Sequence, residues 1–102
     1  MTNEQTISWI FLATALATNT KPSDINGISL VADGINHAVP TQKELQTSIS
    51  WLTKRGLIIK QGKSYELTAN GKFEYETVSK NTDKLLAIWK NLEIKFNSYA
   101  DR

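Results

Sequence analysis

The sequence predicts a mainly α-helical protein with one small β-hairpin, an α+β fold in a single domain. Three observations support this prediction. Helix-capping patterns occur at Thr2 and Thr41, two short β-prone runs flank Gly62, and apolar residues recur at helical spacing along the remaining chain. The length of 102 residues suits one hydrophobic core.

The composition is that of a globular protein, with 40% hydrophobic and 22% charged residues. No cysteine is present, which excludes disulfides, thiolate catalysis and cysteine-ligated zinc. The longest apolar run, residues 7–17, is too short to span a bilayer, and Glu4 is the only charged residue before it, so we expect no secretion signal. These features predict a cytoplasmic protein without a membrane partner.

The first helix is predicted from about Glu4 to Thr18. Thr2 and Gln5 have the spacing of a capping box at its start. Apolar residues cover most of the circumference of this helix, so it needs neighbours on more than one side.

The second helix is expected to open at Pro22 or Ser23 and to end near His37. Its expected buried residues are Ile25, Ile28, Leu30 or Val31, and Ile35. After a turn that ends at Pro40, the T-x-x-E pattern of Thr41 and Glu44 predicts the start of a third helix.

The third helix is predicted over residues 41–55, and Gly56 then supplies the left-handed conformation that commonly follows a helix end. Residues 57–61 and 64–68 are expected to form a hairpin around Gly62 and Lys63. Thr68 then caps a fourth helix over about residues 69–79. The side chains available for its packing are Phe73 and Tyr75 or Val78.

The last helix is predicted from Thr82 or Asp83 to Ala100, and its apolar residues form a heptad seam. The seam residues are Leu85, Trp89, Leu92, Phe96 and Tyr99. Residues 1–80 thus form the main unit, and residues 81–102 add a C-terminal helix to the same domain. The seam suits either a homodimer interface, with Trp9 and Phe11 contributed by the first helix, or cover for the first helix of its own chain.

The third helix divides into two faces when its residues are placed at about 100° intervals. Leu45, Ile49 and Leu52 fall on one side and form the expected buried face. The opposite side carries Lys43, Thr47, Ser50 and Lys54, with Gln46 at its edge. Such side chains hydrogen-bond base edges and phosphates in a DNA major groove, although any solvated helix face has a similar composition. No arginine lies on this outward stripe.

Positive charge is concentrated in the same part of the chain. Residues 41–64 hold five basic residues and one acidic residue, a net +4, whereas the rest of the chain has a net charge of −2. Arg55, Lys60 and Lys63 are placed to contact phosphates, because backbone contacts need charge more than exact geometry.

The pattern T-x-x-E-L-x-x-x-I-x-x-L-x-x-R-G-L-I from Thr41, followed by Y-x-L-T-x-x-G from Tyr65, resembles winged helix-turn-helix transcription regulators of the MarR and PadR kind. Residues 33–41 are also similar to a segment of small uncharacterised bacterial winged-helix proteins. The resemblance covers about residues 23–75. It implies a dimer that binds double-stranded DNA through a recognition helix at 41–55 and a wing at 57–68. The alternative is a winged-helix protein-interaction module without DNA binding.

The sequence offers little for catalysis or metal binding. His37 is the only histidine, and with Asp33 one turn earlier it suits either a tuned base or metal ligand, or a helix-end residue interacting with the helix dipole. No P-loop, nucleophile elbow or nucleophile–base pair is present, and Glu74 and Glu76 point apart on a helix. We expect no enzymatic activity and no cofactor. A small-molecule effector is not identified by the sequence.

Overall fold

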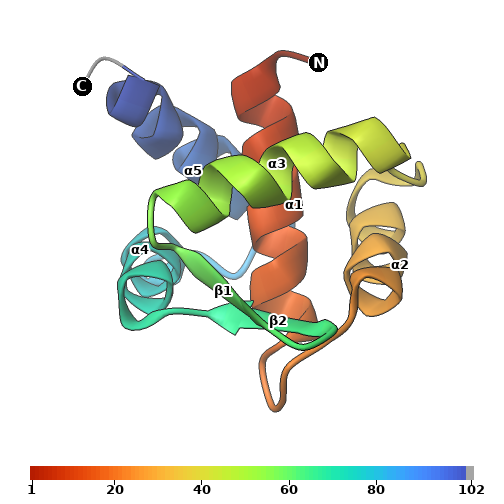
Figure 1. The fold of residues 1–102 in the computed structure, drawn as a ribbon. Coiled ribbons are helices and arrows are strands. Elements are labelled where there is room, and N and C mark those ends of the chain that lie inside the picture. Colours follow the sequence, from red (N-terminus) through yellow and green to blue (C-terminus); the bar gives the residue numbers. More distant parts are fainter. Residues whose placement is uncertain (101–102) are drawn as a thin grey trace.

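The computed structural model describes residues 1–100, Ala100 by its backbone alone. Within them, four helices and one hairpin are arranged around a central helix, α1 (Figure 1). The elements are α1 Asn3–Ala17, α2 Ile25–Asn36, α3 Gln42–Lys54, β1 Ile58–Gln61, β2 Ser64–Leu67, α4 Ala69–Ser79 and α5 Leu85–Ala100. The predicted mainly helical α+β class with a small antiparallel hairpin is confirmed. No helix of the described residues is long and apolar enough to cross a membrane.

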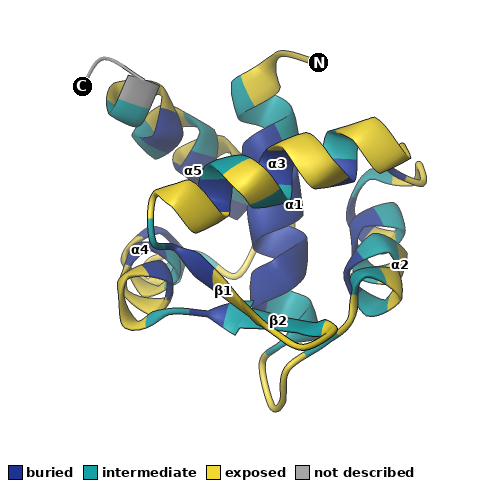
Figure 2. Ribbon diagram, in the orientation of Figure 1, coloured by how far each residue is buried: buried dark blue, intermediate teal, exposed yellow. Residues whose placement is uncertain are grey.

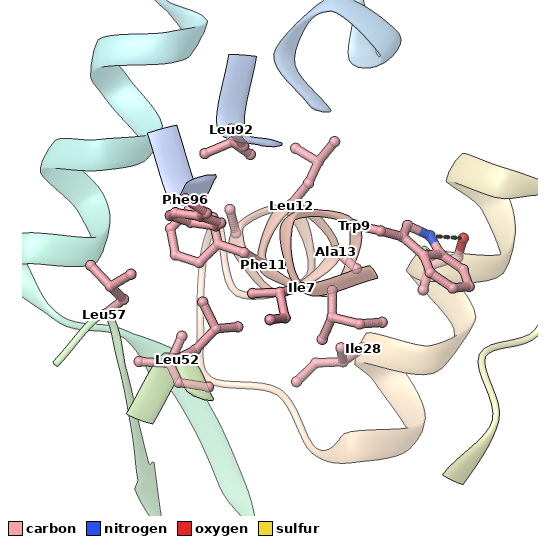
Figure 3. Close-up of a cluster of buried hydrophobic side chains, with 14 of the residues drawn as sticks. Ile7, Trp9, Phe11, Leu12, Ala13, Ile28, Leu52, Leu57, Leu92 and Phe96 are labelled. Carbon is pink, nitrogen blue, oxygen red and sulfur yellow. Dashed lines mark hydrogen bonds between the residues drawn. The ribbon is translucent and has the colours of Figure 1, made fainter. Parts of the chain in front are cut away.

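The α1 helix is the centre of the core. Its predicted capping box is confirmed, because Thr2 Oγ1 accepts a hydrogen bond from the Gln5 backbone N–H at 3.1 Å while Gln5 Oε1 accepts one from the Thr2 N–H at 2.8 Å. All nine residues from 7 to 15 are buried. Figure 3 shows side chains leaving α1 in different directions toward the other helices. The neighbours α2, α3 and α5 supply the cover that its all-round apolar pattern requires.

The α2 helix begins later than expected, at Ile25. Asp24 is its cap and accepts a hydrogen bond from the Gly27 N–H at 2.8 Å. Ser23 instead exchanges two backbone hydrogen bonds with Tyr65, at 3.0 and 2.7 Å, and so lies as a one-residue third strand beside β2. The expectation that Pro22 or Ser23 opens the helix was therefore wrong, because the hairpin uses the Ser23 backbone.

The α3 helix and the hairpin match their predicted limits to within one residue. Thr41 Oγ1 accepts from the Glu44 N–H at 3.0 Å and Glu44 Oε1 accepts from the Thr41 N–H at 2.8 Å, which confirms the second capping box. Gly56 (φ +71°) ends the helix and Gly62 (φ +63°) opens the two-residue turn between the strands. The strands pair antiparallel from Ile58 opposite Leu67 to Gln61 opposite Ser64.

The α4 helix has the predicted bounds, and Thr68 caps it by accepting a hydrogen bond from the Gly71 N–H at 3.0 Å. Its packing agrees with the prediction at Val78 and differs from it at Phe73. Phe73 is 64% exposed, whereas Val78 and Glu74 are buried. The Glu74 carboxylate accepts hydrogen bonds from Lys95 at 3.2 Å and from the Tyr99 hydroxyl at 2.8 Å. These bonds connect α4 to α5.

The α5 helix begins at Leu85, two or three residues later than predicted, and packs against α1 of its own chain. The Trp9 and Trp89 rings stack at 6.2 Å, and the Phe11 and Phe96 rings meet edge to face at 5.4 Å. The intramolecular alternative for the heptad seam is therefore the arrangement observed.

This packing corrects part of the proposed dimer interface. Four of its seven residues are at most 1% exposed within a single chain, and they are Trp9, Phe11, Leu92 and Phe96. They belong to the intramolecular core, since an apolar seam has the same spacing whether its own chain or a second chain covers it. Trp89 and Tyr99 are half-buried and Leu85 is 40% exposed.

Candidate functional site

The outward side of α3 is a polar, exposed face on a helix that packs against α1. It carries the five residues predicted from helical spacing, all exposed, and we call them the α3 face: Lys43, Gln46, Thr47, Ser50 and Lys54. On the opposite side Leu45, Ser48 and Leu52 are buried against α1. Figure 2 shows the exposed residues along α3 in front of the buried α1. Packing of one side of α3 thus determines which side chains point to solvent.

Most of the α3 face borders one shallow depression. Gln46, Thr47, Ser50 and Lys54 line it together with Trp51 and Arg55. Lys43 lies apart from this group, one turn nearer the start of α3, in a separate groove that it shares with Asn3 and Thr6 of α1. The structure therefore brings together four residues of the α3 face and the predicted phosphate contact Arg55, and it adds Trp51.

The Arg55 side chain lies back along α3. Arg55 is the residue after α3, yet its guanidinium carbon lies over the Trp51 ring, 4.2 Å from the ring centroid. Side chains on a helix lean toward its N-terminus, so a residue at the helix end covers the turn before it. The guanidinium thus belongs to the α3 depression, although the residue itself falls outside the outward stripe.

Trp51 lies beneath the Arg55 guanidinium, and this position was not identified from the sequence. The signal was present, because a tryptophan and an arginine four residues apart are neighbours on a helix and form a favourable cation–π pair. Trp51 is half-buried, and its other contacts are with α5, where the Phe96 and Tyr99 ring centroids lie 5.3 and 5.9 Å away.

The hairpin carries the remaining predicted cations. Lys60 on β1 and Lys63 in the turn are both exposed. Lys60 Nζ lies 5.7 Å from the centroid of the Tyr65 ring, opposite it in the strand register. The hairpin follows the end of α3, and β1 contacts α3 (Figure 1). The exposed Lys60 and Lys63 therefore add positive charge beside that of α3.

Among residues 1–100, the basic residues of this region form no ion pair with an acidic residue. The ion pair present in that part of the chain is that of Lys95 on α5 with Glu74 on α4. Glu44 is the one acidic residue between positions 41 and 64, and its carboxylate accepts the Thr41 N–H within the capping box. The five cations from Lys43 to Lys63 therefore present unneutralised positive charge to solvent, which attracts polyanions.

The acidic and histidine residues do not assemble into a metal site. Within the described part of the chain, no group of three such residues is placed to hold a metal ion. His37 is exposed at the end of α2, in the left-handed conformation (φ +56°), and its backbone N–H bonds the Asp33 carbonyl at 2.7 Å. This is the position of a helix-end residue.

Comparisons with protein-family models, with curated proteins and with solved structures found no match to this chain. Function is therefore inferred from the residues, burial and charge of this chain alone.

Proposed function

We propose that this protein is a winged helix-turn-helix protein that binds double-stranded DNA without catalysis, as a transcription regulator. In this proposal α3 is the recognition helix and lies in the major groove, with α2 as the preceding helix. The hairpin is the wing and contacts the phosphate backbone. The single observation that carries the proposal is the unneutralised basic surface formed by α3 and the hairpin.

The order and pairing of the elements support this assignment. Two helices joined by the short turn before Pro40 are followed at once by a hairpin, and Ser23 forms an isolated antiparallel bridge with Tyr65 of β2. The turn places the exposed side of α3 outward while α1 holds its other side. A DNA-reading helix needs this arrangement, since its side chains must reach base edges from a rigid support.

The side chains of the surface support DNA as the ligand. Gln46, Thr47 and Ser50 offer donors and acceptors to base edges, and Lys43 and Lys54 flank them with charge. Lys60 and Lys63 place two further cations on the wing. A protein-interaction module of the same fold is the alternative, but it has no evident need for this concentration of unpaired cations.

Binding of a fluorescent random-sequence duplex at increasing salt tests the proposal. Wild-type protein should bind at low salt and weaken steeply as salt rises, because each phosphate contact releases counterions and contributes about −0.9 to the slope of log K against log salt. The double variant Lys60→Ala with Lys63→Ala should bind more weakly and reduce that slope by up to about 2.

The matched control is Lys80→Ala with Lys84→Ala, which removes the same charge from exposed positions outside α3 and the hairpin. It should leave the slope close to that of the wild type. Absence of duplex binding at low salt would favour the interaction module. The proposal includes a homodimer formed through exposed side chains, and sedimentation of the intact chain at micromolar concentration measures it.

A further inference from the structure

Arg55 is an exposed cation that is held in place without using its hydrogen-bond donors. Its guanidinium rests on the Trp51 ring, a contact with the aromatic face. Within residues 1–100 its side chain has no carboxylate partner and makes no hydrogen bond. All five N–H donors of the guanidinium therefore remain available to a ligand in the depression.

The ring beneath Arg55 is itself supported from the core. Trp51 packs on Phe96, which is fully buried and packs edge-on against Phe11 of α1. Tyr99 holds the same indole from α5 and is fixed by its hydrogen bond to Glu74. A continuous series of aromatic contacts thus runs from α1 through α5 to Trp51 and its bound guanidinium. The apolar seam of α5 supports the surface of α3.

We propose that Arg55 reads a guanine in the major groove and that Trp51 is its positioning residue. This inference rests on the proposed function, because it assumes that α3 lies in a DNA groove. Guanine presents two acceptors there, N7 and O6, and the arginine fork matches both at once. An arginine already ordered on a ring loses less conformational freedom when it binds than a free lysine does.

The competing role for Arg55 is a phosphate contact, and chemistry separates the two roles. A phosphate contact depends mainly on charge, which lysine retains. A bidentate guanine contact is held most closely by the planar arginine fork, whereas the lysine ammonium can bond N7 and O6 without that fixed geometry. Arg55→Lys therefore keeps the charge while it weakens the proposed base recognition.

The experiment selects bound sequences from a randomised duplex pool, first with wild-type protein and then with Arg55→Lys. Wild type should enrich a guanine at a fixed position, and Arg55→Lys should lose about five- to a hundredfold of that preference. The affinity of Arg55→Lys for the unselected pool should change less than threefold, because lysine retains the positive charge that attracts phosphates. Replacing the enriched guanine by 7-deazaguanine, which lacks the N7 acceptor, should weaken wild type more than it weakens Arg55→Lys.

Two further variants test the positioning role of Trp51. Trp51→Ala should lower the guanine preference, and Trp51→Phe should largely restore it, since phenylalanine keeps an aromatic face for the guanidinium. Thermal melts of both variants check that the fold is intact. Wild type that binds the pool without enriching guanine, or Arg55→Lys with an unchanged preference, would overturn the inference while the proposed function stands. Absence of any duplex binding by wild type would overturn both.

Discussion

Helices α1 and α3 begin with the same capping motif but differ in how much of their surface is buried. Each opens with a threonine whose capping box is complete, at Thr2 and at Thr41. All nine residues from 7 to 15 of α1 are buried, whereas α3 buries Leu45, Ser48 and Leu52 and exposes most of its other side. Local signals thus define where both helices begin, and the neighbours decide how much of each is covered.

The difference follows from position in the fold. Helices α2, α3 and α5 surround α1, so each direction from its axis meets an apolar partner. The α3 helix packs on α1 and β1, and through Trp51 on α5, while its outward side faces solvent. Core packing does not constrain which residues occupy the exposed side of α3, so these residues can be suited to binding. A functional surface is therefore best sought on α3.

The largest expected loss of stability comes from a substitution in the buried part of α1. Leu12→Ala, at a fully buried position, should lower the free energy of unfolding by about 2–5 kcal/mol, because it removes apolar contacts and leaves a cavity. Ser50→Ala, on the α3 face, should change it by less than about 0.5 kcal/mol. Urea denaturation followed by circular dichroism measures both.

Comparing the stability losses of Leu12→Ala and Ser50→Ala tests whether α1 is buried and the α3 face is exposed in solution. Similar losses for the two variants would mean that the α3 face is covered in solution, for example by a second chain. Ile10→Ala serves as a repeat at another fully buried position of α1 and should resemble Leu12→Ala.

Two helical glycines allow the same comparison in other helices, because Gly71 of α4 faces a close neighbour and Gly34 of α2 faces open space. A Cβ on Gly71 of α4 would lie 2.0 Å from the Leu57 carbonyl oxygen, whereas a Cβ on Gly34 of α2 would meet nothing within 4 Å. Gly71→Ala should destabilise by about 1–3 kcal/mol, because the backbone has to move. Gly34→Ala should stabilise by about 0.5–1 kcal/mol, since alanine favours the helix. Thermal melts report the sign of each, and destabilisation by Gly34→Ala would show that the open side of α2 is covered.

Local patterns in the sequence predicted the elements well. The capping boxes, the glycine after α3 and the Thr68 cap each depend on residues within one or two turns, so they are readable without tertiary contacts. The start of α2 was misplaced because the hydrogen bonds of Ser23 go to Tyr65, 42 positions further along the chain. The close approach at Gly71 likewise depends on a distant carbonyl.

The candidate site was predicted in part for the same reason. Helical spacing alone identified the outward residues of α3. The position of the Arg55 guanidinium required the side-chain direction as well as the spacing. The support of Trp51 by Phe96 required the fold of α5 onto its own chain, and an apolar seam does not name the surface that covers it.

The smallest expected effect compares one buried serine from each helix. Ser8 of α1 donates its hydroxyl to the Glu4 carbonyl at 2.7 Å, whereas Ser48 of α3 is equally buried and its hydroxyl has no hydrogen-bond partner among the described residues. Ser8→Ala should destabilise by about 0.5–1.5 kcal/mol because a hydrogen bond is lost. Ser48→Ala should be neutral or stabilise by up to about 1 kcal/mol, because it removes a polar group that is desolvated without compensation. Alanine improves helix propensity equally in both variants, so the difference between the two free energies of unfolding isolates the hydroxyl. Equal destabilisation in urea would show instead that the Ser48 hydroxyl is hydrogen-bonded in solution. The buried serines of α1 and α3 would then both have hydrogen-bond partners.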